Sequence, residues 1–285
     1  MAKVSYPHYA WAVGHGLVLL GTIHTFLGFI TLSFRSKSYY LAYAGAIISW
    51  GIVVYKSLGA PQPNRAYVQR ALLDENVQYL LLALYWFLTK PIALTLLPFA
   101  TFSLFHTLTF IRTSILPKVP ATSSSSSSKS SSSSATQQAQ TQTLSFGVKL
   151  SKTIQTWVKQ NYETAMLFVA YIEVILVFSR ILLGAITFQN SLLTPLIFGH
   201  FLRLRYYLSP PTRKAFTWLN QQVVERYVIK NGSVPEIVKK GVGIVRELII
   251  RYSESIIQVQ QPGAGAGGAA AAAGGGGAAQ QRRAQ

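Results

Sequence analysis

The sequence contains no cysteine, and only eight of its 285 residues are acidic. Without cysteine the chain has no disulfide framework, no thiolate metal site and no cysteine nucleophile. The histidines lack the i, i+4 spacing of a helical metal site, and no clustered carboxylates accompany them. A Gly-x-Ser-x-Gly elbow, a phosphate-binding loop and a dinucleotide fingerprint are also missing. We therefore predict a protein that is not an enzyme and that has no metal or cofactor.

Basic residues, by contrast, are plentiful. The chain has 26 Lys and Arg residues and a formal net charge of +18, although only 12% of its residues are charged. That charged share is about half of the roughly 25% typical of soluble domains. The bases lie between and after apolar stretches, where they would face anionic lipid headgroups. This distribution favours a membrane surface as the partner, and we predict no nucleic acid.

Long stretches without any charged residue are the strongest positive signal. They cover residues 9–34, 38–55, 91–111 and 181–202. A bilayer core about 30 Å thick needs roughly 20 helical residues to cross it. We therefore predict an all-α, multi-pass helical membrane protein built from helical hairpins, and we interpret the first apolar run as an uncleaved anchor.

The first predicted hairpin joins residues 11–32 to residues 39–58. Gly14, Gly21 and Gly28 repeat every seven residues, so they share one helix face and allow another helix to approach closely. The second apolar region, residues 77–111, is divided at Lys90-Pro91. Its first half is short for a span, so this region forms either a complete two-helix hairpin or a shallow wedge that does not cross.

Composition divides the chain into five predicted regions. Low-complexity tracts cannot form a core, and we predict that both of them are disordered. In the third region a basic amphipathic lead-in (144–160) precedes a membrane helix (162–188) and a short apolar segment (192–202). The regions are an N-terminal membrane region with two hairpins (1–116), a Ser/Gln-rich linker (117–143), a C-terminal membrane region (144–208), cytosolic basic amphipathic helices (209–260) and a Gly/Ala-rich tail (261–285).

Two helices are predicted in the basic amphipathic region. Thr212 can cap the first, and a capping box at residues 233–236 opens the second, which runs to about Val259. The second has an apolar face with basic residues around it, as in helices that lie in an anionic membrane interface. Packing of this face on the protein's own helices is the alternative. The face comprises Val238, Val242, Val245, Leu248, Ile249, Tyr252 and Ile256, and the headgroup-contacting bases are Lys239, Lys240, Arg246 and Arg251.

The predicted membrane helix at residues 162–188 carries two charges at membrane depth. Glu173 and Arg180 are seven residues apart, which is two turns and almost one face of a helix. Charges at membrane depth are expensive and usually face protein or water. The pair predicts either an ion pair, with each other or with a neighbouring helix, or a transport or proton-relay site. We favour the ion pair, which fixes how helices assemble, and keep a transporter, channel or lipid-translocating protein as the alternative function.

The distribution of bases also predicts an orientation. A cytosolic N-terminus places most Lys and Arg residues in the cytosol, whereas the opposite side receives Arg35, Lys37 and Lys90. The positive-inside rule therefore favours cytosolic N- and C-termini.

Several segments of the chain together resemble the transmembrane protein 33 family. They are residues 71–81 (ALLDENVQYLL), Pro91, residues 97–99 and 102–106, and residues 201–207 (FLRLRYY). The resemblance covers about residues 11–252. It implies a multi-pass protein of the endoplasmic reticulum membrane and nuclear envelope that shapes or organises curved membrane and supports nuclear pore complex distribution or assembly. It also implies reticulon-type membrane proteins and nucleoporins as partners, and membrane binding by residues 234–259. A homo-oligomer is left open.

Overall fold

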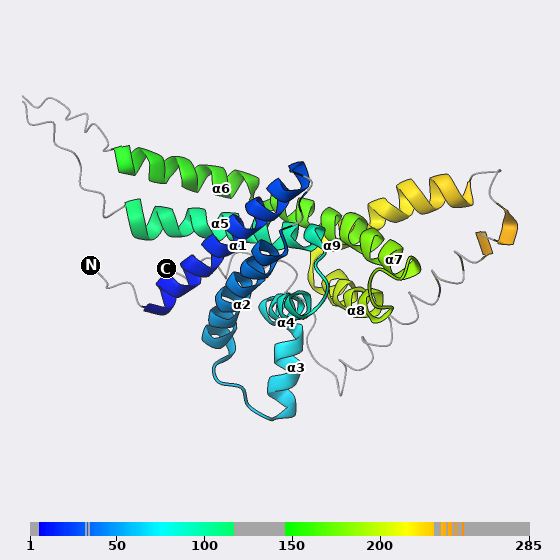
Figure 1. Cartoon of the computed structure of the whole chain (residues 1–285), viewed down its shortest axis with the longest axis horizontal. Coiled ribbons are helices and arrows are strands. Elements are labelled where there is room, and N and C mark those ends of the chain that lie inside the picture. Colours follow the sequence, from blue (N-terminus) through cyan, green and yellow to red (C-terminus); the bar gives the residue numbers. More distant parts are fainter. Residues whose placement is uncertain are drawn as a thin grey trace, which may run out of the picture. The chain divides into compact units, whose positions relative to one another are not determined.

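The computed structural model describes residues 6–31, 33, 35–116, 146–230, 235–237, 239, 240, 243 and 247. All regular elements among these residues are helical (Figure 1). The predicted linker (117–143) and tail (261–285) lie outside them. The elements are α1 (Tyr6–Ile30), α2 (Ser36–Leu58), α3 (Arg65–Leu73), α4 (Glu75–Leu88), η1 (Ala93–Thr95), α5 (Leu96–Phe110), η2 (Ile111–Ile115), α6 (Phe146–Tyr171), η4 (Ile172–Val177), α7 (Phe178–Ile186), α8 (Leu193–Leu208), α9 (Pro210–Leu219) and η5 (Asn220–Ile229).

Four described segments are long and apolar enough to cross a membrane. They are Tyr6–Gly28, Ser36–Leu58, Ala93–Ile115 and Gly147–Ile186. These spans and the absence of strands among the described residues confirm the predicted fold class, an all-α multi-pass membrane protein. By contact the chain divides into two units, Met1–Arg226 and Tyr227–Gln285, and the paragraphs below concern the first.

Helices α1 and α2 form the predicted hairpin, and glycine is what lets them approach. A Cβ atom on Gly14 would lie 2.7 Å from the carbonyl oxygen of Gly45, and one on Gly21 would lie 2.7 Å from that of Ser38. The Ser49 hydroxyl reaches across the same interface and donates to the Trp11 carbonyl at 2.9 Å. The glycine face predicted from the sequence is therefore a helix contact.

Helices α4 and α5 form a second hairpin. Asp74 caps α4 by accepting from the Asn76 amide at 2.8 Å, which separates α4 from α3. Beside α2, α4 runs antiparallel, from the Ser57–Asp74 hydrogen bond (3.4 Å) to the Tyr40–Thr89 bond (3.4 Å). Its 14 residues, about 21 Å of helix, fall outside the candidate spans, yet α4 accompanies most of α2. This packing favours the complete hairpin over the shallow wedge.

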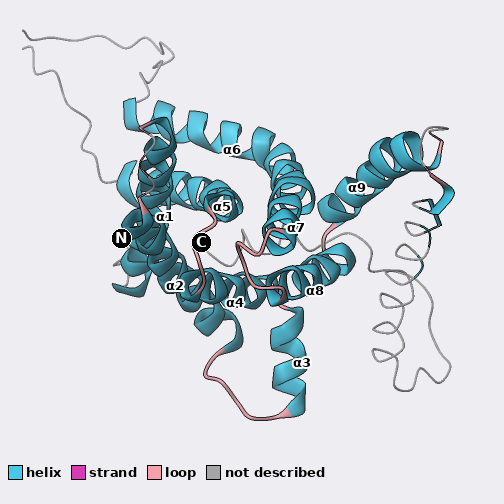
Figure 2. Cartoon of the chain, turned by 45° about the vertical axis from the view of Figure 1, so that its right-hand side comes forward, coloured by secondary structure: helices cyan, strands magenta, loops and turns pink. Residues whose placement is uncertain are grey.

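The third hairpin differs from the sequence prediction. The lead-in at 144–160 and the membrane helix at 162–188 were expected to be separate, but α6, η4 and α7 form one helical run that includes the 40-residue span Gly147–Ile186. The reason is local, because no proline and only two glycines fall within this run. Figure 2 shows the run passing from α6 into α7, after which α8 returns.

Helix α8 lies antiparallel to α4. The hydroxyls of Tyr85 and Thr194 lie 2.8 Å apart at the start of α8, and Arg205 reaches Glu75 near its end. Helix α9 then begins with prolines in its first turn, after Ser209. Thr212, which the sequence predicted as the cap, is instead buried inside the first turn, because proline favours the first helical position.

These contacts define two ends of the bundle. At the first, called the basic end, the starts of α1 and α6 lie near the ends of α2 and η2. His8 and Ser114 lie 3.3 Å apart there, and Gly147 lies against Leu116. The opposite end holds the connections that follow α1, α4 and α7, and Tyr43 and Thr95 are hydrogen-bonded at 2.7 Å near it.

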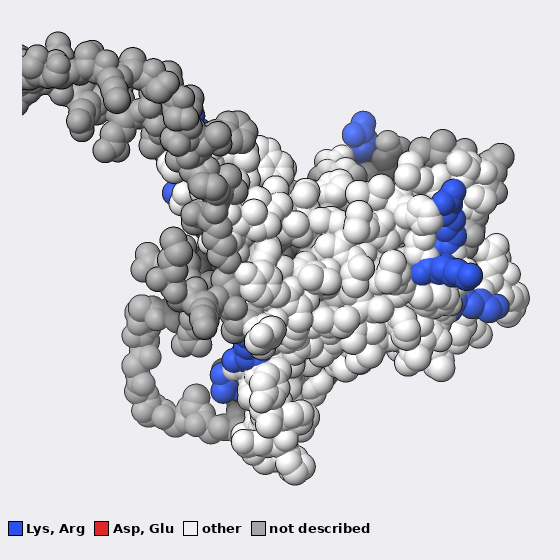
Figure 3. All heavy atoms as spheres, turned by 60° about the vertical axis from the view of Figure 1, so that its left-hand side comes forward, with Lys and Arg blue, Asp and Glu red and all other residues white. Residues whose placement is uncertain are grey.

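Charge is distributed unevenly between the two ends. Figure 3 shows one face of the molecule, with a broad uncharged surface and Lys and Arg side chains near its margins. Around the opposite end lie Arg35, Lys37, Lys90 and Arg180. The connections and helix ends at the basic end carry Lys56, Arg65, Arg70, Arg112, Lys149 and Lys152.

Candidate functional site

The most distinctive site in the described residues is a buried ionic cluster between α4, η4 and α8. Glu75 opens α4, where a carboxylate interacts favourably with the helix dipole. Tyr79 follows four residues later and therefore lies on the same face. Glu75 is half-exposed, whereas the Tyr79 side chain is buried. One helix turn thus places a carboxylate and a phenol side by side, directed towards α8.

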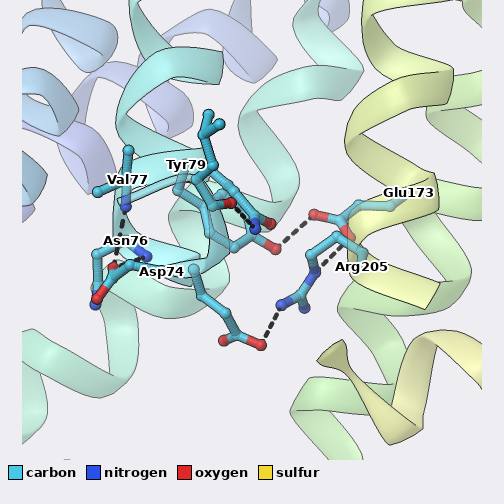
Figure 4. Close-up of polar contacts among 9 residues, drawn as sticks. Asp74, Asn76, Val77, Tyr79, Glu173 and Arg205 are labelled. Atoms are coloured by element: carbon cyan, nitrogen blue, oxygen red, sulfur yellow. Dashed lines mark hydrogen bonds and ion pairs between the residues drawn. The ribbon is translucent and has the colours of Figure 1, made fainter. Parts of the chain in front are cut away.

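Arg205, near the end of α8, is the centre of the cluster (Figure 4). Its side chain is only 4% exposed, and its Nη1 lies 2.8 Å from Glu75 Oε1. Its Nε lies 3.9 Å from Glu173 Oε2, the separation of an ion pair rather than a hydrogen bond. The guanidinium carbon is also 5.3 Å from the centre of the Tyr79 ring, in cation–π range. One guanidinium therefore contacts side chains from two other elements.

Glu173 comes from η4, in the middle of the long α6–α7 run, and is 1% exposed. Its Oε1 accepts a hydrogen bond from the Tyr79 hydroxyl at 2.7 Å. A buried carboxylate is tolerated only where charge and hydrogen bonds compensate for lost solvation. Tyr79 and Arg205 supply both, so the cluster holds the three elements together. We call Glu75, Tyr79, Glu173 and Arg205 the ion clamp.

The structure corrects the predicted pairing of Glu173 with Arg180. The Nη2 of Arg180 instead donates to Gln189 Oε1, in the turn after α7, at 3.1 Å. The prediction assumed 3.6 residues per turn, but the π-helical segment η4 changes the register between the two residues. Of the alternatives left open, an ion pair with a neighbouring helix is the one that forms.

Sequence reasoning did not identify Glu75, Tyr79 and Arg205 as partners of Glu173. A signal was nevertheless present, because these residues lie in the two segments that carry the family resemblance, residues 71–81 and 201–207. The structure brings the two segments into contact. Their pairing follows from the antiparallel packing of α4 and α8, which spacing along the chain does not reveal.

Little of the predicted membrane-binding face lies in the described residues. Lys239 and Lys240 are in a helical segment of the second unit, where Lys239 Nζ pairs with Glu236 Oε1 at 3.1 Å. The seven apolar residues of the face, with Arg246 and Arg251, lie outside the described residues. The face itself stays a prediction.

The fold and the ion clamp define a class: an α-helical, multi-pass membrane protein whose helices are locked by a buried ionic cluster. Among the described residues no group of three or more His, Asp or Glu side chains is arranged to hold a metal ion. The chain belongs to the Transmembrane protein 33/Nucleoporin POM33 family, whose model matches residues 1–255.

Three fungal relatives support this membership. Nucleoporin POM33 of Chaetomium thermophilum is 31% identical, over 80% of this chain and 79% of the relative. Pore membrane protein of 33 kDa of Saccharomyces cerevisiae is 30% identical, over 89% and 86%. Tetra-spanning protein 1 of Schizosaccharomyces pombe is 27% identical, over 90% and 88%. No solved structure matches the chain.

Proposed function

We propose that this chain is a non-enzymatic membrane protein of the nuclear envelope and endoplasmic reticulum that supports nuclear pore complexes and organises curved membrane. Two relatives bear names that link them to the pore, nucleoporin POM33 and pore membrane protein of 33 kDa. The observation that carries the proposal furthest is the set of basic residues at the helix ends and connections of the basic end.

In this proposal the basic end faces the cytosol. Lysine and arginine side chains there are attracted to the anionic cytosolic leaflet, by about 1 kcal/mol for each residue near the surface. The helix predicted from residue 235 adds its apolar face to the same leaflet. Insertion into one leaflet increases the area of that leaflet and favours positive curvature. Reticulon-type proteins and nucleoporins are the proposed protein partners.

The ion clamp has a supporting role in this proposal. It fixes α8 against α4 and η4, and α8 leads directly to α9 and the basic C-terminal region. A displaced α8 would change where that region leaves the bundle. Both charged groups of η4 and α7 are engaged with other side chains, Glu173 in the clamp and Arg180 with Gln189. This arrangement favours a structural role over a transport pathway.

We expect the full-length chain, tagged with a fluorescent protein, to concentrate at the nuclear envelope in foci that coincide with pore complexes. Replacing Lys239, Lys240, Arg246 and Arg251 by glutamine should weaken this enrichment, because four bases at about 1 kcal/mol each are removed from the membrane surface. Quantitative imaging measures both effects. Replacing Arg35, Lys37 and Lys90, on the opposite end, is the matched control. Uniform distribution of the wild-type chain over all membranes would contradict the proposal.

A cytosolic C-terminal region makes a second prediction. Asn231-Gly232-Ser233 is an acceptor motif for N-glycosylation, which takes place only on the lumenal side. We expect it to stay unmodified in microsomes, with no mobility shift on glycosidase treatment. The same motif inserted with a flexible spacer between α1 and α2 is the positive control and should be glycosylated. Modification of native Asn231 would reverse the proposed orientation.

A further inference from the structure

The outer face of α6 is polar along a segment that packs beside a membrane span. Its exposed residues Lys149, Lys152, Thr156, Lys159 and Glu163 follow one another at alternating spacings of three and four. Such spacing places them in one stripe along a helix. We call these five residues the polar stripe.

The opposite face of α6 is already occupied. The Trp157 ring stacks on Phe105 of α5 with centroids 5.6 Å apart, and Val158 is buried. At the start of α6, a Cβ atom on Gly147 would lie 3.3 Å from the Leu116 carbonyl oxygen. Helix α6 therefore lies along α5 with its apolar side inward, and the polar stripe points away from the bundle.

The polar stripe lies beside a membrane span, which makes the exposure of its charged side chains unusual. Trp157 and Tyr162 both contact Phe105, which lies within the candidate span Ala93–Ile115. Lys159 and Glu163 are therefore beside a membrane-crossing segment. Among the described residues neither has an ion-pair partner. Charges at this level normally face protein or water, because contact with lipid tails is costly.

We propose that a second copy of this chain covers the polar stripe, with the two α6 helices related by a two-fold axis. Lys159 and Glu163 carry opposite charges one turn apart, so the stripe is self-complementary. The axis runs along the membrane normal, so the two helices are parallel and Thr156 faces Thr156 of the other copy. Each lysine can then reach diagonally to the glutamate of the other copy, one turn along, and two ion pairs form. Gln155, Thr156, Lys159 and Gln160 line a shallow hollow on this face that can receive side chains of the second copy.

A lipid headgroup fits this surface less well. An anionic phosphate would be attracted to the lysines, but it would be repelled by Glu163 in the same stripe. The amide and hydroxyl groups of Gln155, Thr156 and Gln160 can both donate and accept hydrogen bonds, which suits another polar helix. The mixture of charges and amides therefore favours a second copy over an anionic lipid.

The absence of cysteine makes a direct test simple. Thr156→Cys in the full-length chain, oxidised in native membranes, should give a disulfide-linked dimer. Val13→Cys is the matched control, because Val13 is 62% exposed on α1 and neighbours the residues that contact Ser103 and His106 of α5. We expect about tenfold more dimer from the first variant, which corresponds to about 1.4 kcal/mol. Equal cross-linking of the two variants would overturn the proposal.

Charge reversal in the Thr156→Cys background distinguishes a second copy of the chain from a lipid headgroup as the partner of the stripe. Lys159→Glu alone should reduce the dimer about tenfold, because the two glutamates of each copy then face those of the other. Lys159→Glu combined with Glu163→Lys restores opposite charges and should restore the dimer. An unchanged dimer in the single variant would contradict the proposal. A second result would also contradict the proposal: both variants lose the dimer, and phosphatidylserine stabilises the wild-type monomer in nanodiscs. That result would assign the stripe to a lipid headgroup.

Discussion

Arg205→Ala is expected to destabilise the folded bundle by about 3–5 kcal/mol, the range found when one partner of a buried ion pair is removed. The substitution leaves the Glu173 carboxylate, 1% exposed, with only the Tyr79 hydroxyl as a partner. It also removes the cation from the Tyr79 ring and from Glu75. Thermal unfolding of the purified protein in nanodiscs measures the effect as a lower midpoint.

Arg213→Ala is the matched control, because Arg213 is an exposed arginine in the next helix, α9. Its effect should fall within about 0.5 kcal/mol, as for most surface substitutions. Arg205→Lys should lie between the two, since lysine keeps the charge but loses the planar guanidinium. Equal midpoints for Arg205→Ala and Arg213→Ala would show that the ion clamp does not hold the bundle.

A double-mutant cycle tests the coupling within the clamp. Glu173→Gln should recover part of the stability lost in Arg205→Ala, because a neutral amide no longer requires a cation in a buried position. The two residues are in contact, so their effects should deviate from additivity by about 0.5–3 kcal/mol. Strict additivity would instead mean that Arg205 and Glu173, whose Nε and Oε2 atoms lie 3.9 Å apart, make no net contribution to stability through their interaction.

Features that depend on neighbouring residues in the chain could be predicted from the sequence. Charge-free stretches long enough to cross a bilayer identify a helical membrane protein because hydrocarbon excludes charge. The α1–α2 hairpin followed from two such stretches joined by a short turn, and Gly14 and Gly21 lie at its interface as expected. The continuous α6–α7 run was also within reach of the sequence, since no residue in it breaks a helix.

The ion clamp could not be predicted in the same way. Its members lie on three elements, and Glu75 and Glu173 are separated by the turn at residues 89–92 and by the linker. Which of many bases meets Glu173 depends on the antiparallel alignment of α4 and α8, a tertiary feature. The π-helical register at η4 adds a further difficulty, because it turns Arg180 away from the face that regular α-helical spacing assigns to it.

Gly21→Leu is expected to disrupt the α1–α2 hairpin, and even Gly21→Ala should destabilise the protein by about 1–3 kcal/mol through overpacking. The added Cβ would lie 2.7 Å from the Ser38 carbonyl oxygen, 2.8 Å from the Ala42 Cβ and 2.9 Å from the Ala42 amide nitrogen. Two of these atoms belong to the backbone of α2, so no side-chain rotation relieves the contact and the helices must separate.

Gly16→Ala is the control within the same helix, because nothing lies within 4 Å of its added Cβ atom. Alanine is the better helix former by about 1 kcal/mol, so this variant should be neutral or slightly more stable. Thermal unfolding in nanodiscs compares the two alanine variants under identical conditions. Both variants make the same chemical change in α1, so a lower midpoint for Gly21→Ala and an equal or higher one for Gly16→Ala would separate the contact with α2 from helix propensity. Equal midpoints would exclude close packing at Gly21 as a source of stability.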